Sequence, residues 1–201
     1  MEKVDFVRVD FALIPDEPLF GSVIRASQAI TDEFYYNENI IDDKTFPPHL
    51  SLHICTVPQG KVQQVIDELG ALAGRVDLSD INPLGIEPSY GGYVMLSIER
   101  TTEIMTLHEE ILGLAASARE GVGADKYGSE YIRDSFVPHV SLAKVDLHDL
   151  TSAAAIGRQA LGSCDPTRTR TLDLCDIGPR SERWDILASF PIGNPQSSER
   201  C

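Results

Sequence analysis

The 201-residue sequence predicts an α+β protein built from two similar halves. One short phrase occurs twice, as FPPHLSL over 46–52 and as FVPHVSL over 136–142, with the shared pattern apolar-His-apolar-Ser-apolar. A second pair of segments, 86–93 and 177–184, repeats a proline and an aromatic residue at equal spacing. Both pairs are offset by about 90 residues, so one alignment relates the halves. We therefore expect a bilobal fold with a pseudo-two-fold repeat, two antiparallel sheets facing a central groove, and helices on the outer faces.

Hydrophobic periodicity assigns the elements of the first half. Apolar alternation predicts strands, and apolar residues at a spacing of three to four predict helices. Pro15 and Pro18 end the first strand, and Gly74 ends the second helix. The predicted elements are a strand over 4–14, a helix over 21–36, the first motif strand over 49–56, a helix over 59–73, and strands over 80–87 and 92–99.

The second half has a similar order. Its first helix has Thr101 or Thr102 as a candidate N-cap, because a hydroxyl oxygen can accept from the first free amides. The predicted elements are a helix over 101–118, a polar Gly-rich loop over 120–134, the second motif strand over 137–145, a helix over 149–161, and a hairpin of strands over 169–177 and 184–190. We expect one bilobal domain over 1–193, with halves of about 1–100 and 101–193, and a flexible tail over 194–201.

Composition restricts the class of partner. Seventeen basic and 31 acidic residues give a net charge of -14, which disfavours tracking along a nucleic-acid backbone but permits a small phosphate ligand. The sequence contains no apolar run long enough for a membrane span, and its first residues lack the apolar core of a signal peptide. We expect a cytoplasmic monomer without membrane association. The four cysteines form no CxxC pair and are expected to be reduced thiols: Cys55, Cys164, Cys175 and Cys201.

The repeated phrase has the composition of a proton-transfer site. On a strand, alternate side chains share a face, so His49 and Ser51 point one way and the leucines between them point into a core. His139 and Ser141 repeat the arrangement. Histidine gives or takes a proton near neutral pH, so one imidazole can act as base while the other acts as acid. The hydroxyls can donate to the oxygens of a phosphoryl group.

These two phrases resemble the signature of the 2H phosphoesterase superfamily, which has one His-x-[Ser/Thr]-apolar motif in each half of a bilobal α+β protein. The resemblance implies metal-independent cleavage of a phosphodiester, often a 2′,3′-cyclic phosphate opened to a 2′-phosphate, as in the bacterial 2′-5′ RNA ligase and RNA 2′,3′-cyclic phosphodiesterase branch. It implies that His49 and His139 are the acid and base. Ser51 and Ser141 would bind phosphate, where many members have threonine.

Two other functions remain open. One is a hydrolase of cyclic oligonucleotide signals or of 2′-5′ linkages. The other is a nucleotide-binding module without turnover, although two complete motifs favour the enzyme. The expected partner is a small nucleotide or an RNA end, and no cofactor is expected.

Several further residues are candidates for contacts with the organic part of a ligand. Tyr127 and Tyr131 precede the second motif, and Arg180 and Arg183 occupy the last hairpin turn, where they contact a ligand or form a solvated turn. Two other aromatic residues fit equally a stacking surface or the hairpin core: Tyr93 and Trp184. His53 has the parity of His49 on the same strand. The two would be about 13 Å apart, too far to share a metal ion, and no metal site is predicted.

Overall fold

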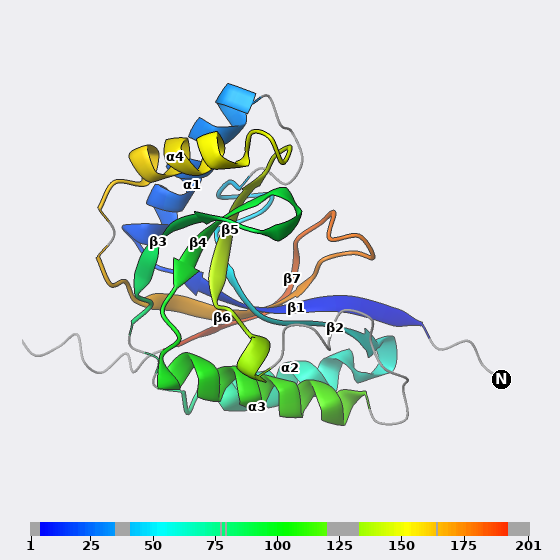
Figure 1. The fold of residues 1–201 in the computed structure, drawn as a ribbon. Helices are drawn as coiled ribbons and strands as arrows, with labels where there is room; N and C mark the ends of the chain where they lie inside the picture. Colours follow the sequence, from blue (N-terminus) through cyan, green and yellow to red (C-terminus); the bar gives the residue numbers. More distant parts are fainter. Residues whose placement is uncertain are drawn as a thin grey trace, which may run out of the picture.

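The computed structural model describes residues 5–34, 41–76, 78, 80–119, 133–163 and 165–192. Within these ranges the chain forms a mixed α+β fold in which helices pack on a sheet (Figure 1). The α+β class predicted from the sequence is confirmed. The predicted tail, together with Tyr127 and Tyr131, lies outside the described residues.

The elements follow the predicted order closely. Thr101 caps the third helix, where its Oγ1 accepts from the amide of Ile104 at 3.3 Å. The strands are β1 (Phe6–Pro15), β2 (Leu50–Pro58), β3 (Pro83–Pro88), β4 (Tyr93–Ile98), β5 (His139–Lys144), β6 (Thr169–Asp176) and β7 (Asp185–Pro191). The α-helices are α1 (Leu19–Phe34), α2 (Val62–Ala73), α3 (Thr102–Ala118) and α4 (Leu150–Leu161).

The described strands form one seven-stranded antiparallel sheet in the order β3-β4-β5-β2-β1-β6-β7. The sequence predicted two separate sheets. The structure differs because β2 and β5, the two motif strands, are hydrogen-bonded neighbours at the centre of the sheet. They are paired at one position only, Leu50 with Val140, whereas β1 and β2 are paired along nearly their whole length. The two groups of strands therefore join through one short contact.

The first six strands in chain order, β1 to β6, are arranged with two-fold symmetry in the sheet. Exchanging β1 with β4, β2 with β5 and β3 with β6 reverses the order of the six strands without otherwise changing it. Each unit then runs strand, helix, strand, helix, strand, and its last strand crosses to the edge of the other unit. β7 lies outside this pattern as an additional edge strand.

The helices pack in two pairs, α1 with α4 and α2 with α3, with the sheet between the pairs in Figure 1. Helix α1 covers β5, and α3 covers β2. Each motif strand is therefore supported by a helix from the other unit. The side chains between helices and sheet form the main core, which includes Leu50, Leu52, Val140 and Leu142.

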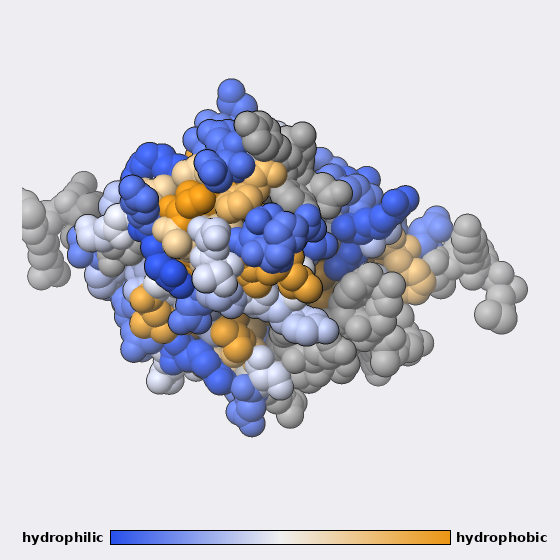
Figure 2. Space-filling view, turned by 45° about the horizontal axis from the view of Figure 1, so that its top comes forward, coloured by the Kyte–Doolittle hydropathy of each residue, from blue (hydrophilic) through white to orange (hydrophobic). Residues whose placement is uncertain are grey.

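The surface is mixed in hydropathy on the side that Figure 2 shows. In the face shown in Figure 2, apolar residues occur in separate patches among hydrophilic ones. Among the described residues, the helices are too short or too polar to cross a membrane. Cys55 and Cys175 are both buried.

Candidate functional site

The two motif strands place their polar side chains on one face of the sheet. Leu50 and Val140, the paired residues, are fully buried in the main core. Since successive side chains of a strand point to opposite faces, the histidine and serine on either side of each paired residue point away from this core. We call this side the motif face, after the four residues that it carries: His49, Ser51, His139 and Ser141.

The antiparallel pairing also sets which of these residues are neighbours. The register of the single pair Leu50–Val140, if extended by one residue in each direction, would set His49 beside Ser141 and Ser51 beside His139. Directly opposed side chains in such a pair have Cβ atoms roughly 5 Å apart. The structure thus brings the four motif residues together at the junction of the two units.

A β-bulge follows the serine of the first motif. Ala12 of β1 is paired with Ser51, but the preceding Phe11 is paired with His53, so Leu52 is an extra residue in β2. An extra residue changes the alternation of side chains between faces. His53 consequently lies on the side of Phe11, which belongs to the main core. The sequence-based prediction that His53 shares the face of His49 and Ser51 is wrong for this reason.

The second motif has the same bulge at the same place. Met95 of β4 is paired with Ser141 and Val94 with Ala143, so Leu142 is the extra residue in β5. The two bulges correspond in the sequence repeat, because Leu52 and Leu142 are the last residues of the two phrases. This irregularity is a feature of the repeated motif, not of one strand.

The helices satisfy the backbone at both bulges. His108 of α3 donates through Nδ1 to the carbonyl of Leu52 at 2.7 Å, and Ser27 of α1 donates through Oγ to the carbonyl of Leu142 at 2.6 Å. Both donors are fully buried. A buried carbonyl without a partner would cost about 1–3 kcal/mol, so these contacts stabilise the irregular strands that present the motif residues.

The two catalytic candidates have matched ring orientations. His49 Nδ1 lies 2.9 Å from the carbonyl oxygen of Pro47, and His139 Nδ1 lies 2.8 Å from that of Val137. A carbonyl oxygen only accepts, so Nδ1 carries the hydrogen in both rings. Each neutral imidazole therefore keeps the lone pair of Nε2, the atom that can take a proton from a substrate or water.

Aromatic rings surround the first histidine. The Trp184 ring centroid is 4.2 Å from that of His49, and the Phe46 centroid is 5.4 Å from it. Phe46 and Trp184 also contact each other, at 5.3 Å between centroids. Trp184 is buried in a second apolar cluster with Ala12 and Cys175. The sequence left this tryptophan as either a core or a stacking residue, and in the structure it is a buried residue that packs against His49.

Burial keeps both histidines neutral at physiological pH. The loss of solvent around His49 lowers its pKa to about 4, the hydrogen bond to Pro47 opposes this change, and the charge of a protonated His139 lowers it further. Burial also lowers the pKa of His139, against the effect of its own hydrogen bond to Val137. The influence of one imidazole on the other is consistent with their closeness on the motif face.

Asp10, an acidic residue beside the motif residues, was not predicted from the sequence as part of the site. It lies on β1 and is 2 % exposed. Its Oδ2 lies within hydrogen-bond distance of the Ser51 hydroxyl oxygen, at 2.6 Å, and 3.8 Å from His49 Nε2. A charged residue inside the apolar strand VDFALI was the available signal, because an acid in a buried strand needs a polar partner.

The arginines of the last hairpin turn differ in their contacts. Arg183 forms ion pairs with Asp176 and Asp185, and these carboxylates raise its pKa. Arg180 is exposed, and its backbone amide donates to Glu182 at 2.7 Å. The contacts of Arg183 agree better with a structural turn than with an anion site.

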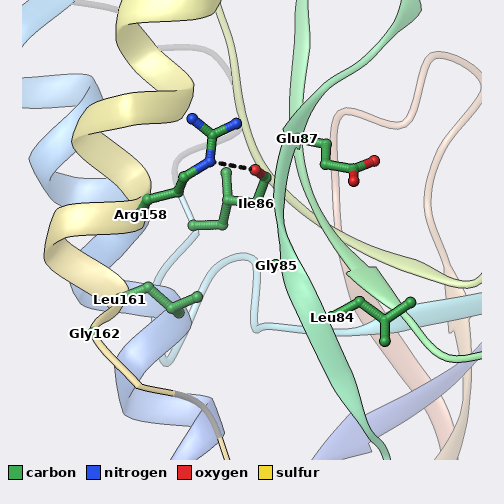
Figure 3. Close-up of a pocket in the computed structure, with 7 residues that line it drawn as sticks. All are labelled: Leu84, Gly85, Ile86, Glu87, Arg158, Leu161 and Gly162. Atoms are coloured by element: carbon green, nitrogen blue, oxygen red, sulfur yellow. Dashed lines mark hydrogen bonds between the residues drawn. The ribbon is translucent and has the colours of Figure 1, made fainter.

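One surface hollow lies on the helical side of the sheet, away from the motif face. Its volume is about 350 Å³, and Figure 3 shows Arg158 of α4 reaching across to β3, where its Nε donates to the Ile86 carbonyl at 2.8 Å. The lining residues are Leu84, Gly85, Ile86, Glu87, Arg158, Leu161 and Gly162. Arg158 therefore links α4 to the strand that the helix covers.

Potential metal ligands occur together at one place in the described part of the chain. Asp146, His148 and Asp149 lie in the turn between β5 and α4. Asp146 and His148 are exposed, and such acidic groups are common on surfaces without an ion. We assign no metal to them.

Comparison with known proteins gives a structural answer. No protein-family model matches the chain, and no curated protein matches its sequence. Among solved structures, Escherichia coli LigT complexed with phosphate covers 94% of this chain and 99% of its own length, with a TM-score of 0.52 and 14% identity. The structures of E. coli LigT with ATP and with NADP+ also have TM-scores of 0.52, with 15% identity; each covers 94% of this chain, and this chain covers 100% and 98% of them. At these identities the likeness shows the fold alone: the chain has the fold of LigT.

Proposed function

We propose that this protein is a phosphodiesterase that acts on a nucleotide or RNA-end phosphodiester, most favourably a 2′,3′-cyclic phosphate, by two-histidine acid–base catalysis. One observation carries the proposal: His49 and His139 are on neighbouring strands, and each ring is tied through Nδ1 to the carbonyl two residues earlier. This leaves Nε2 of both rings for proton transfer. We propose that this hydrolysis needs no cofactor.

The reaction follows from the two roles that an imidazole can take. One neutral histidine accepts a proton at Nε2 from the water whose oxygen attacks phosphorus. The new P–O bond forms while the bond from phosphorus to the ribose 3′ oxygen breaks. The other histidine, protonated, donates its Nε2 proton to the leaving oxygen. The product is a 2′-phosphate with a free 3′ hydroxyl, and a proton exchange with water resets the pair.

Substrate binding supplies the acid form. The pKa values of both histidines are lowered in the unliganded protein, so both rings are neutral near pH 7. A phosphodiester anion beside them favours the charged imidazolium, because an opposite charge within a few ångströms raises the pKa of a base. The hydroxyls of Ser51 and Ser141, on the same face, would donate to the non-bridging oxygens as charge develops there.

The acidic net charge of the protein favours a small ligand over a long nucleic acid. The net charge of -14 provides no long basic track for a nucleic-acid backbone, so we propose that a nucleotide or a single RNA end occupies the motif face. The LigT structures contain phosphate, ATP and NADP+, which is consistent with such a ligand on this fold. We further propose a monomer with a pseudo-two-fold axis between β2 and β5, since the strand order has this symmetry.

A substrate panel tests the proposal. The protein is incubated, with excess EDTA, with 2′,3′-cyclic nucleotides, 3′,5′-cyclic nucleotides, RNA ending in a cyclic phosphate, and 2′-5′ dinucleotides. We expect 2′-phosphate products from the 2′,3′-cyclic substrates at the same rate with and without the chelator. Loss of turnover in EDTA that zinc or manganese restores would contradict the mechanism. Binding without turnover of any substrate would identify a nucleotide-binding module instead.

A further inference from the structure

The carboxyl group of Asp10 has two oxygens in different situations. Oδ2 contacts the Ser51 hydroxyl at 2.6 Å and lies 3.8 Å from His49 Nε2. Oδ1 is fully buried and has no hydrogen-bond partner among the described residues. An ionised carboxylate seeks partners for both oxygens, and leaving one of them dry is costly. A neutral carboxylic acid tolerates this arrangement better, because its carbonyl oxygen carries no full charge.

Burial favours the neutral form of Asp10, against two neighbours that lower its pKa, the Ser51 hydroxyl and Arg8. On its own strand, Arg8 is the nearby cation and lowers the pKa of Asp10, but its guanidinium also donates to the Pro179 carbonyl at 3.1 Å. From β6, Cys175 is paired with Asp10, and Asp173 lies two residues away on the same strand. From β2, the facing groups are the neutral His49 and Ser51, and a further acid, Asp185, is in β7. Burial is the largest influence and raises the pKa of Asp10 to about 7.

The direction of the Ser51 hydrogen bond depends on this protonation. If Asp10 is ionised, Ser51 must donate its only hydrogen to Oδ2 and has none for a ligand. If Oδ2 carries a proton, Asp10 donates to Ser51 Oγ across the same 2.6 Å. The serine hydrogen is then free to turn toward the motif face, while Oγ still accepts from Asp10.

We propose that Asp10 is a positioning residue that, as a neutral carboxylic acid, donates to Ser51 and so directs the serine hydroxyl hydrogen to a phosphoryl oxygen. This inference rests on the proposed function, because it takes a tetrahedral oxyanion as the ligand of the motif face. Ionisation of Asp10 reverses the hydrogen bond, removes one donor and adds a negative charge beside the anion. Binding of the anion and ionisation of Asp10 therefore oppose each other.

In the second half of the molecule, the position that corresponds to Asp10 is not acidic. Ala12 and Met95 are the residues paired with the two serines, each beside the bulge. Two positions earlier on the strand, β1 has Asp10 and β4 has Tyr93. Ser141 therefore has a tyrosine where Ser51 has a carboxyl group, so its hydroxyl does not depend on Asp10. The chain thus contains a matched internal control.

The first experiment measures the protonation of Asp10 directly. Carboxyl ¹³C resonances of the full-length protein are followed against pH by NMR, and the Asp10 signal is assigned by its absence in Asp10→Asn. We expect Asp10 to titrate near neutral pH and its midpoint to rise when sulfate binds. A midpoint in the ordinary acidic range of aspartate would overturn the proposal, whatever the protein binds or cleaves.

The second experiment measures affinity for inorganic sulfate, a tetrahedral dianion whose own charge is constant through the neutral range. For the wild type, we expect affinity to fall about ten- to a hundredfold as Asp10 ionises, because a charge-assisted donor is lost. Asp10→Asn keeps an N–H donor toward Ser51 and should lack this fall. Ser51→Ala should bind more weakly at low pH and show a smaller Asp10-linked fall, because only the repulsion by the ionised carboxylate remains, whereas Ser141→Ala should bind more weakly and keep the full fall.

The role of Asp10 and the enzymatic activity can be contradicted separately. Equal pH dependence of sulfate binding in the wild type and Asp10→Asn overturns the role of Asp10, even if cyclic phosphates are hydrolysed. Sulfate binding with the expected pH dependence, but without turnover of any phosphodiester, supports the role of Asp10 and contradicts the enzyme. Stability of Asp10→Asn is checked by urea unfolding, and the NMR titration of the wild type stands without it.

Discussion

The two halves of the site share a backbone and differ in their surroundings. Both histidines donate through Nδ1 to the carbonyl two residues before them. His49, however, is enclosed by Phe46 and Trp184 and is 9 % exposed, whereas His139 is only partly buried. Phe136, the counterpart of Phe46, stacks at 4.1 Å on the structural His108 instead.

This difference suggests how a repeated motif acquires two roles. Acid–base catalysis on one phosphodiester needs one group that takes a proton and another that gives one, so identical surroundings would be a disadvantage. The repeat supplies matched positions through equal bulges and equal ring anchors. The unrepeated residues around them, above all Asp10 and Trp184, change the electrostatics of one half only.

Removing either histidine should have the largest effect. We expect His49→Ala and His139→Ala each to reduce kcat by about 10²- to 10⁴-fold, the usual range for a lost acid or base. The double variant should be little worse than either single one, since groups that act as one unit are non-additive. Steady-state kinetics with a 2′,3′-cyclic nucleotide would measure this. Cleanly multiplicative losses would show that the histidines act independently.

Replacing Asp10 should change how the free energy of unfolding depends on pH. The folded pKa of Asp10 is about 7, above its ordinary value of 3.8, so folding holds a proton that the unfolded chain releases. Stability therefore falls as pH rises from about 4 to 7, and the full difference corresponds to roughly 4 kcal/mol. Asp10→Asn should remove this loss, and its advantage over the wild type should grow across that interval. Urea unfolding at a series of pH values measures it. An advantage that does not vary with pH would argue against a buried neutral acid.

The two serines offer a closer comparison. Ser51→Ala and Ser141→Ala should each lose about 2–4 kcal/mol of transition-state stabilisation, as for a lost oxyanion donor. Their effects on folding should differ. Ser51→Ala also leaves the second oxygen of Asp10 without its partner and should lower the free energy of unfolding by about 1–3 kcal/mol, whereas Ser141→Ala should be nearly neutral. Equal losses of stability in the two variants would mean that the contact with Asp10 contributes nothing.

Periodicity predicted the elements because most of their apolar residues lie in one core. The segments around Leu69 and Ile111 alternate at helical spacing and form helices, and Thr101 caps α3. Periodicity could not predict that the strands form one sheet. The two groups of strands join through one residue pair, Leu50 with Val140, and such a pair has no signature in the hydrophobic pattern.

The site was predictable only as far as the repeat extends. The sequence repeat placed His49 and His139 at matched positions, and simple alternation correctly separated them from the core. The rule that alternate residues share a face gave the wrong side for His53, two residues after Ser51. The bulge adds one residue to β2 without any change in the hydrophobic pattern of the sequence. Asp10 was missed because its partner, Ser51, is 41 residues away, on a strand whose register to β1 the sequence does not reveal.

The smallest effect is expected from removing the hydrogen bond by which Ser27 of α1, in the first half, stabilises the second motif strand, β5. Ser27 of α1 donates to the carbonyl of Leu142 at the β5 bulge, where His108 serves the corresponding carbonyl of Leu52. Ser27→Ala leaves a buried carbonyl unsatisfied and should cost about 1–3 kcal/mol of stability, at the lower end if the strand relaxes. Thr31→Val is the control, since among the described residues the Thr31 hydroxyl donates to carbonyls of its own helix, those of Ser27 and Gln28. Because β5 carries His139 next to this bulge, Ser27→Ala should also speed amide exchange in β5 and lower kcat, while β2 keeps its protection. Equal exchange in both motif strands would show that the two bulges are not held separately by their helices.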